Sequence, residues 1–169
     1  SKMAEKRKSP ESSPAPAPGS TSNFDAVRAG AFVEREWHSS CIPTLHEYIT
    51  IPNLSPTFDT QWASNGLQEK VVDLFANWVR SKEVPGLSME IVRLEGKTPL
   101  IFIEVEPTTS AVDDVGTVLL YGHLDKQPPF TGWNEGLHPY RPVIKDGKLF
   151  GRGGADDGYA LFSAITAIR

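Results

Sequence analysis

Residues 119–125 read LLYGHLD, an apolar run that ends in a glycine and a His-x-Asp pair. The run from Val118 to Tyr121 is typical of a buried parallel strand, because both faces of such a strand are covered. Ligands of open α/β sheets bind at the carboxyl ends of such strands. The strand period of two places His123 and Asp125 on the same side. One of them can then bind a metal ion while the other orients it, since a metal-bound imidazole usually donates its second N–H to a carboxylate or a carbonyl.

A second motif, GRGGADDG at residues 151–158, gives the support that a lone His-x-Asp pair needs. Its glycines allow the backbone to approach a site closely. The adjacent carboxylates of Asp156 and Asp157 repel each other unless a cation or hydrogen bonds offset the repulsion. A divalent metal ion is the simplest such cation, and an aspartate that bridges two metal ions fits this sequence. Helix capping alone explains one aspartate better than two.

Other interpretations of the glycine-rich motif do not fit the sequence. A dinucleotide fingerprint requires a third glycine where Asp156 stands, and a carboxylate there would repel a pyrophosphate at a helix N-terminus. A phosphate-binding loop requires Gly-Lys-Ser/Thr, which does not follow these glycines. The sequence also contains no Gly-x-Ser-x-Gly elbow of a serine hydrolase.

Hydrophobic periodicity predicts two helical regions before the first motif. The first helix is predicted from Asp25 to His38, and Pro43 then either kinks it or begins a second piece that reaches Ile49. An amphipathic helix is predicted over residues 66–82, and its apolar stripe indicates core packing rather than a cofactor site. The residues of that stripe are Leu67, Val71, Leu74, Phe75 and Trp78.

Strands are predicted over residues 87–94, 100–105 and 143–150, the last one interrupted by a turn. Residues 159–168 are apolar around most of a helical wheel, which predicts a helix buried on nearly all sides. No helix stop signal precedes the end of the chain, so we expect an N-terminal part of a longer enzyme. The predicted fold class is α/β, a layered sheet with flanking helices that is truncated at its C-terminal side.

The composition indicates a globular chain with a distinct N-terminal region. Residues 1–22 are first basic and then rich in Pro, Ser and Ala, which predicts a flexible tail before a catalytic-domain segment over 23–169. The tail carries a net charge of +2 and the whole chain −4, so the remainder carries −6. This negative charge argues against a nucleic-acid partner. No apolar stretch has the length of a membrane span or the character of a signal peptide. We therefore expect no membrane partner and a cytoplasmic location.

Cys41 is the single cysteine, which excludes an internal disulfide and suits a reducing compartment. It lies near His38 and His46 in the sequence, so a metal site of thiolate and imidazole is one interpretation. No carboxylate or second cysteine completes that set, and a helix thiol with two surface histidines is the better interpretation.

The motifs in their order and spacing resemble the zinc exopeptidases that include carboxypeptidase G, aminoacylase and carnosinase. The matching residues are YGHLDKQPP from Tyr121, Gly132-Trp133, Pro139-Tyr140 and DGKLFGRGGADD from Asp146. The Gln-Pro followed by Gly-Trp is most similar to the branch that contains carnosinase and the cytosolic nonspecific dipeptidases.

The resemblance implies a site with two zinc ions, although imidazole and carboxylate ligands suit manganese or cobalt as well. It implies that His123 binds one ion, that Asp125 is the acidic catalytic partner, and that Asp156 bridges both ions. The peptide bond between Asp156 and Asp157 is implied to be cis. Many relatives have lysine after the Asp-Asp pair, where this chain has Gly158.

The activity implied by the resemblance is hydrolysis of dipeptides, or of the C-terminal residues of short peptides, by a di-zinc metallopeptidase. Two alternatives stay open: an N-acyl amino-acid deacylase of the same family, and a non-catalytic binding fragment. The family takes its general-base glutamate, another carboxylate ligand and a distant histidine from beyond this region. We therefore expect the 169-residue chain alone to be inactive. The resemblance also allows a homodimer of the full-length protein.

Overall fold

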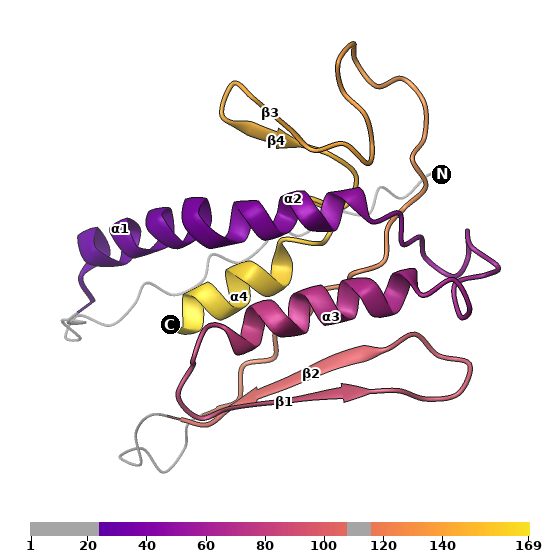
Figure 1. Ribbon diagram of the computed structural model, residues 1–169. Coiled ribbons are helices and arrows are strands. Elements are labelled where there is room, and N and C mark those ends of the chain that lie inside the picture. The colour runs from indigo at the N-terminus through magenta and orange to yellow at the C-terminus, as the bar shows by residue number, and fades with distance from the viewer. Residues whose placement is uncertain (1–23, 108–115) are drawn as a thin grey trace, which may run out of the picture.

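The computed structural model describes residues 24–107 and 116–169, and the predicted tail of residues 1–22 lies outside them. In chain order the elements are α1 (Ala26–Glu36), η1 (Trp37–Cys41), α2 (Ile42–Thr50), α3 (Leu67–Arg80), β1 (Leu87–Val92), β2 (Leu100–Val105), β3 (Val143–Lys145), β4 (Lys148–Phe150) and α4 (Ala160–Ile168). The rod formed by α1 and α2 lies between the small β3–β4 hairpin and a layer of α3 and α4, and the β1–β2 hairpin lies beyond α3 (Figure 1). The mixed α/β class is confirmed.

The rod begins at a side-chain cap and continues past the proline. The carboxylate of Asp25 accepts hydrogen bonds from the N–H groups of Val27 and Arg28, at 3.1 and 3.0 Å, which satisfies two free donors of the first turn. The predicted break near Pro43 is a π-helical turn, η1, in which the N–H of Ile42 bonds to the carbonyl of Trp37. Because Pro43 has no N–H to continue the ladder, the change in hydrogen bonding lies next to it.

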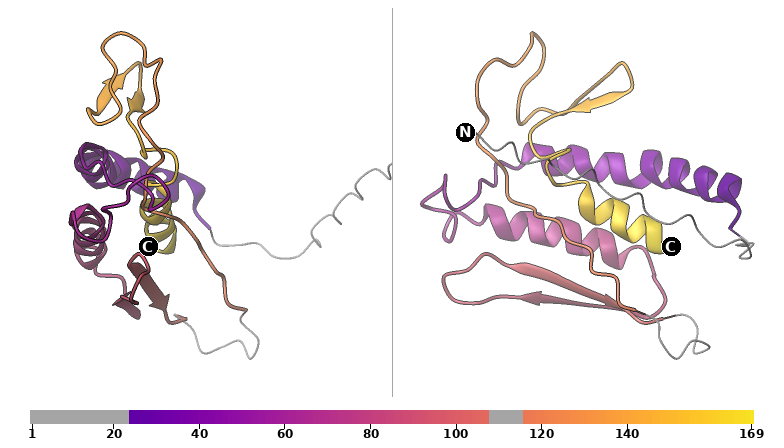
Figure 2. Two further views of the ribbon diagram at one scale, coloured as in Figure 1. Left: turned by 90° about the vertical axis from the view of Figure 1, so that its right-hand side faces the viewer. Right: turned by 180° about the vertical axis from the view of Figure 1, so that it is seen from behind.

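A chain of edge-to-face aromatic contacts joins α2, α3 and α4. The ring centroids are 5.0 Å apart for Tyr48 and Phe75, 4.9 Å for Phe75 and Phe162, and 4.6 Å for Trp78 and Phe162. These rings are buried, and such pairs add about 0.5–1.5 kcal/mol each to the burial of their area. The predicted aromatic stripe of α3 is therefore core packing. The end-on view in Figure 2 shows α4 beside both α3 and the rod.

The predicted strands before and after the first motif form two antiparallel hairpins. In the first, Leu87 of β1 pairs with Val105 of β2, and alternate side chains contact the core beside α3. The strand predicted to reach residue 94 ends at Val92. In the second, the two residues between β3 and β4, Asp146 and Gly147, have φ values of 51° and 71°, which suits a tight hairpin turn.

The prediction of a buried parallel strand at residues 118–121 is wrong. The side chains of this run are 55% to 89% exposed, with Leu120 and Leu119 at the two limits. In the described part of the chain, no strand pairs with the run, and the nearest pairing is a single parallel bridge between Leu54 and Lys126. An apolar run predicts a buried strand only where neighbouring strands satisfy its backbone, and both described sheets are separate hairpins.

The prediction that the last helix is buried on nearly all sides is also wrong. Phe162, Ile165 and Thr166 are buried, whereas Tyr159 and Ile168 are more than 40% exposed. The reason is that α4 packs through one face against α3 and the rod (Figure 2). Among the helices in residues 24–107 and 116–169, none is both long enough and apolar enough to cross a membrane.

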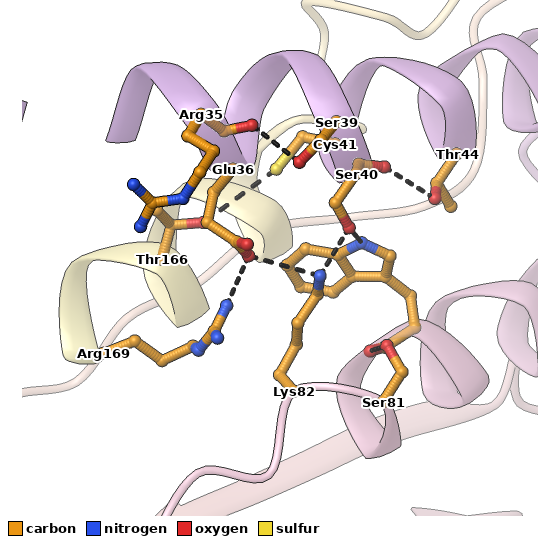
Figure 3. Close-up of polar contacts among 11 residues, drawn as sticks. Arg35, Glu36, Ser39, Ser40, Cys41, Thr44, Ser81, Lys82, Thr166 and Arg169 are labelled. Atoms are coloured by element: carbon orange, nitrogen blue, oxygen red, sulfur yellow. Dashed lines mark hydrogen bonds and ion pairs between the residues drawn. The ribbon is translucent and has the colours of Figure 1, made fainter. Parts of the chain in front are cut away.

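The carboxylate of Glu36, at the end of α1, connects three helices (Figure 3). It accepts from Nζ of Lys82 at 3.3 Å and from the guanidinium of Arg169, which follow α3 and α4 respectively. Lys82 also donates to the hydroxyl of Ser40, which in turn accepts from Nε1 of Trp78 at 2.9 Å. Partial burial opposes ionisation, but the two cations hold the pKa of Glu36 below its usual value.

Candidate metal centre

The imidazole of His123 lies between two carboxylates. Its Nδ1 is 3.2 Å from Oδ1 of Asp125 and 3.0 Å from the backbone oxygen of the same residue. Its Nε2 is 3.4 Å from Oδ1 of Asp156. The structure thus brings together the three side chains that the two motifs single out. About a third of the His123 and Asp125 side chains is exposed, and 64% of Asp156, so the group is open to solvent.

The two ring nitrogens have different partners, which decides what the ring can bind. Since both atoms near Nδ1 are oxygens of Asp125, which only accept, we assign the proton to Nδ1, which then donates a hydrogen bond to Asp125. A neutral ring then has a lone pair on Nε2, which lies close to an oxygen of Asp156. Because the lone pairs of the nitrogen and the oxygen repel each other, this approach requires either a cation between the two atoms or a proton on Nε2. Two ligands of a tetrahedral zinc ion, each bound at about 2.0–2.1 Å, lie roughly 3.3–3.4 Å apart. The observed spacing therefore fits a metal ion bound by both side chains.

Glycines allow the two motifs to touch. A Cβ added to Gly122, the residue before His123, would lie 2.6 Å from Cβ of Ala160, the first residue of α4. The N–H of Ala160 bonds to the carbonyl of Asp157 at 2.9 Å, and the helix starts three residues after Asp157. The peptide bond between Asp156 and Asp157 is cis, which confirms that expectation.

Tyr48 of α2 is a member of the site that the sequence does not predict. Its hydroxyl donates to the carbonyl of Leu124 at 2.8 Å, between the two residues of the His-x-Asp pair. Burial raises the pKa of Tyr48 far above its usual value, and the negative charges of Asp125, Asp156 and Asp157 raise it further. The carboxylates of both motifs are therefore close enough for their charges to act on this phenol.

The described residues supply an incomplete metal site. In residues 24–107 and 116–169, no group of three or more His, Cys, Asp or Glu side chains is close enough to hold a metal ion. A catalytic zinc ion usually has three protein ligands and water, whereas His123 and Asp156 supply two. The alternative around Cys41 is not assembled either. Cys41 is buried, with Sγ 3.9 Å from the hydroxyl of Thr166, and the exposed ring of His38 in η1 bonds to Glu34 of α1.

Comparisons with known proteins match the part of the chain that contains the two motifs. The model of the peptidase family M20/M25/M40 matches residues 119–169, which contain both motifs. Succinyl-diaminopimelate desuccinylase of Nitrosomonas europaea is 40% identical over 72 residues, 41% of this chain and 19% of that protein. Human beta-Ala-His dipeptidase is 43% identical over 53 residues, 31% of this chain and 10% of that protein. An uncharacterized metallohydrolase of Methanocaldococcus jannaschii is 38% identical over 53 residues, 31% of this chain and 13% of that protein.

An imidazole held between two aspartates, one on a glycine-rich loop before a helix, is an arrangement suited to metal-dependent hydrolases. Residues 119–169 are similar to the peptidase family M20/M25/M40. This similarity and the metallohydrolase among the relatives imply a metal cofactor. The chain aligns with a fifth or less of the length of each of these relatives.

Proposed function

We propose that the full-length protein is a di-zinc metallopeptidase that hydrolyses dipeptides or removes C-terminal residues from short peptides. The observation that carries this proposal is the position of His123 between Asp125 and Asp156, in the segment that matches the family. The similarity to a beta-Ala-His dipeptidase supports a dipeptide substrate. The single buried cysteine, Cys41, supports a reducing, cytoplasmic location.

Each of the three side chains has its own role in this proposal. Nε2 of His123 would hold one metal ion, and Asp125 would hold the ring in the tautomer that leaves Nε2 free. The exposed carboxylate of Asp156 would be the ligand shared by the two ions. When bound, the ions supply Lewis-acid polarisation of the scissile carbonyl and a water of lowered pKa. Zinc is the first choice, and manganese or cobalt would use the same ligands.

A second candidate is hydrolysis of an N-acyl amino acid. The desuccinylase of Nitrosomonas europaea aligns over a longer stretch than the dipeptidase, 72 residues against 53, and its name describes removal of an acyl group. The same metal ligands would serve both reactions, since in each reaction water attacks the carbonyl carbon of an amide. The substrate groups beyond the scissile amide distinguish them, so a substrate panel is needed.

The test compares three variants of the full-length protein on dipeptides and on N-acyl amino acids. Asp125→Asn keeps the size and one acceptor oxygen, so turnover should fall about 10–100-fold while metal content is mostly retained. Asp156→Asn removes a shared anionic ligand, so metal content and turnover should fall together. Asp146→Asn, in the turn between β3 and β4, is the matched control and should change neither.

The substrate panel also decides between the candidates. Metal-dependent turnover of dipeptides supports the peptidase, and turnover of acyl amino acids alone supports the deacylase. An Asp156→Asn protein that keeps two zinc ions and normal turnover would show that the bridging assignment is wrong. A wild-type protein that hydrolyses neither class would support a non-catalytic binding role.

A further inference from the structure

Lys126 follows the His-x-Asp pair directly and is completely buried, with 0% of its surface exposed. A lysine is rarely buried unless its ammonium has partners. Here Nζ donates to the carbonyls of Tyr48 at 2.6 Å and Ile51 at 2.5 Å, and it lies 3.7 Å from the centroid of the Tyr48 ring. Both carbonyls lie at the C-terminal end of α2, where helix carbonyls lack intrahelical partners and the helix dipole is negative. Lys126 therefore caps α2 from a distant segment.

The backbone beside Lys126 is bound to the same region. Its N–H donates to the carbonyl of Asn53 and its carbonyl accepts from the N–H of Ser55, each at 2.9 Å. The carbonyl of Leu124 accepts from the Tyr48 hydroxyl and from Nδ2 of Asn53, each at 2.8 Å. Residues 124 and 126 are thus held, and this fixes the backbone from which the His123 and Asp125 side chains project.

The glycine-rich loop packs against the other side of the same two side chains. A Cβ at Gly153 would lie 2.6 Å from Cε of Lys126 and 2.8 Å from the Tyr48 hydroxyl, and one at Gly158 would lie 2.2 Å from the Tyr48 ring. The N–H of Gly158 bonds to the carbonyl of Gly153 at 2.9 Å and closes the loop that carries Asp156. Lys126, which lies in the segment of the His-x-Asp pair, therefore contacts both the end of α2 and the glycine-rich loop.

We propose that Lys126 is a positioning residue, which sets the separation between His123 and Asp156 by binding the end of α2 and supporting the glycine-rich loop. This proposal rests on the proposed function, because it concerns the same metal centre. A direct catalytic role does not fit, since Nζ already has two carbonyl partners and the Tyr48 ring, and no part of the side chain is open to a substrate.

The test uses Lys126→Met and Lys126→Gln in the full-length protein. The two new side chains have similar length, but only glutamine keeps an N–H donor for the carbonyls at the end of α2. Zinc dissociation constants should rise about 10–100-fold for Lys126→Met, as expected for loss of a group that orients ligands, and by less for Lys126→Gln. Trp78→Phe, which removes the hydrogen bond to Ser40 far along α3, is the control for lost stability alone. It should lower the unfolding midpoint and leave the zinc affinity unchanged.

Nitrogen NMR of the His123 ring gives a second measurement that does not need a metal. In the metal-free protein, Lys126→Met should shift or broaden the signals of Nδ1 and Nε2, and Trp78→Phe should not. Wild-type zinc affinity and unchanged ring signals in Lys126→Met would overturn the positioning role. If Lys126→Met does not fold, Lys126→Gln carries both measurements. If the wild-type protein binds no zinc, the proposed function fails, and the ring signals alone decide the role of Lys126.

Discussion

The contact between Gly122 and Ala160 can be tested by adding a single methyl group. In Gly122→Ala the new Cβ would lie 2.6 Å from Cβ of Ala160, whereas two carbon atoms in contact are about 3.5–4.0 Å apart. The segment before His123 and the start of α4 must therefore separate by about 1 Å. The φ angle of Gly122 lies outside the left-handed region, so an alanine can adopt this backbone conformation. The contact with Ala160 is therefore the source of the expected strain. Such overpacking typically costs about 1–3 kcal/mol.

The assay is urea unfolding of four proteins that form a double-mutant cycle: the wild type, Gly122→Ala, Ala160→Gly and the double variant. Ala160→Gly alone should cost about 0.5–1 kcal/mol, because glycine is a poor helix former. The double variant should regain at least about 1 kcal/mol relative to the sum of the single changes. Gly116→Ala, whose added Cβ has nothing within 4 Å, is the control and should change little. A fully stable Gly122→Ala protein, or a cycle with no coupling, would refute the contact between the two motifs.

Three further predictions follow from the core and from its buried charges. Burial lowers the pKa of Lys126 from 10.5 to about 7, so the folded state binds fewer protons than the unfolded state between these values. The free energy of unfolding should therefore rise with pH, by up to about 3 kcal/mol from pH 7 to 9.5. Urea titrations of Lys126→Met should lack this pH dependence, and an equal dependence in both proteins would contradict the lowered pKa of Lys126. The pKa of Glu36 is lowered, so its contribution is present above the unfolded value of 4.5 and is lost as the pH falls through the folded value. Glu36→Gln should cost about 1–2 kcal/mol at pH 7 and little near pH 3, and an equal cost at both values would disagree. Phe162→Ala should cost about 3–5 kcal/mol by calorimetry, because the ring is fully buried between Phe75 and Trp78, and a cost below about 1 kcal/mol would contradict the packing.

Most secondary structure was predictable because its signals are local. Asp25 caps α1, the stripe along α3 has helical spacing, and the Asp146–Gly147 pair forms the β3–β4 turn. The run at residues 118–121 shows where this reasoning ends. Its apolar side chains predict burial, but a strand also needs neighbours for its backbone, and an apolar pattern does not specify which segments supply them.

In the candidate site, too, the residues of local motifs were predictable, and the residues that reach the site through long-range contacts were not. His123, Asp125 and Asp156 belong to short motifs whose residue types indicate metal binding, and the structure brings the three together. Their roles stay predictions. The roles of Tyr48 and Lys126 could not be predicted from the sequence. A tyrosine in a helix is ordinarily part of the core and a lysine is ordinarily on the surface, and no motif marks either of these two residues as part of a site. Their contacts, such as that from Lys126 to Tyr48, join residues 78 positions apart.

Binding of a metal ion between His123 and Asp156 can be measured by a zinc titration of the metal-free full-length protein. Competition with a chromophoric chelator gives Kd for the wild type, His123→Gln, Asp156→Asn and a control, His38→Gln, whose exposed ring in η1 bonds to Glu34 of α1. The wild type and the control should bind zinc equally well, and each of the other variants should bind at least about tenfold more weakly. Equal zinc affinity in all four proteins, or no zinc binding by the wild type, would contradict this prediction.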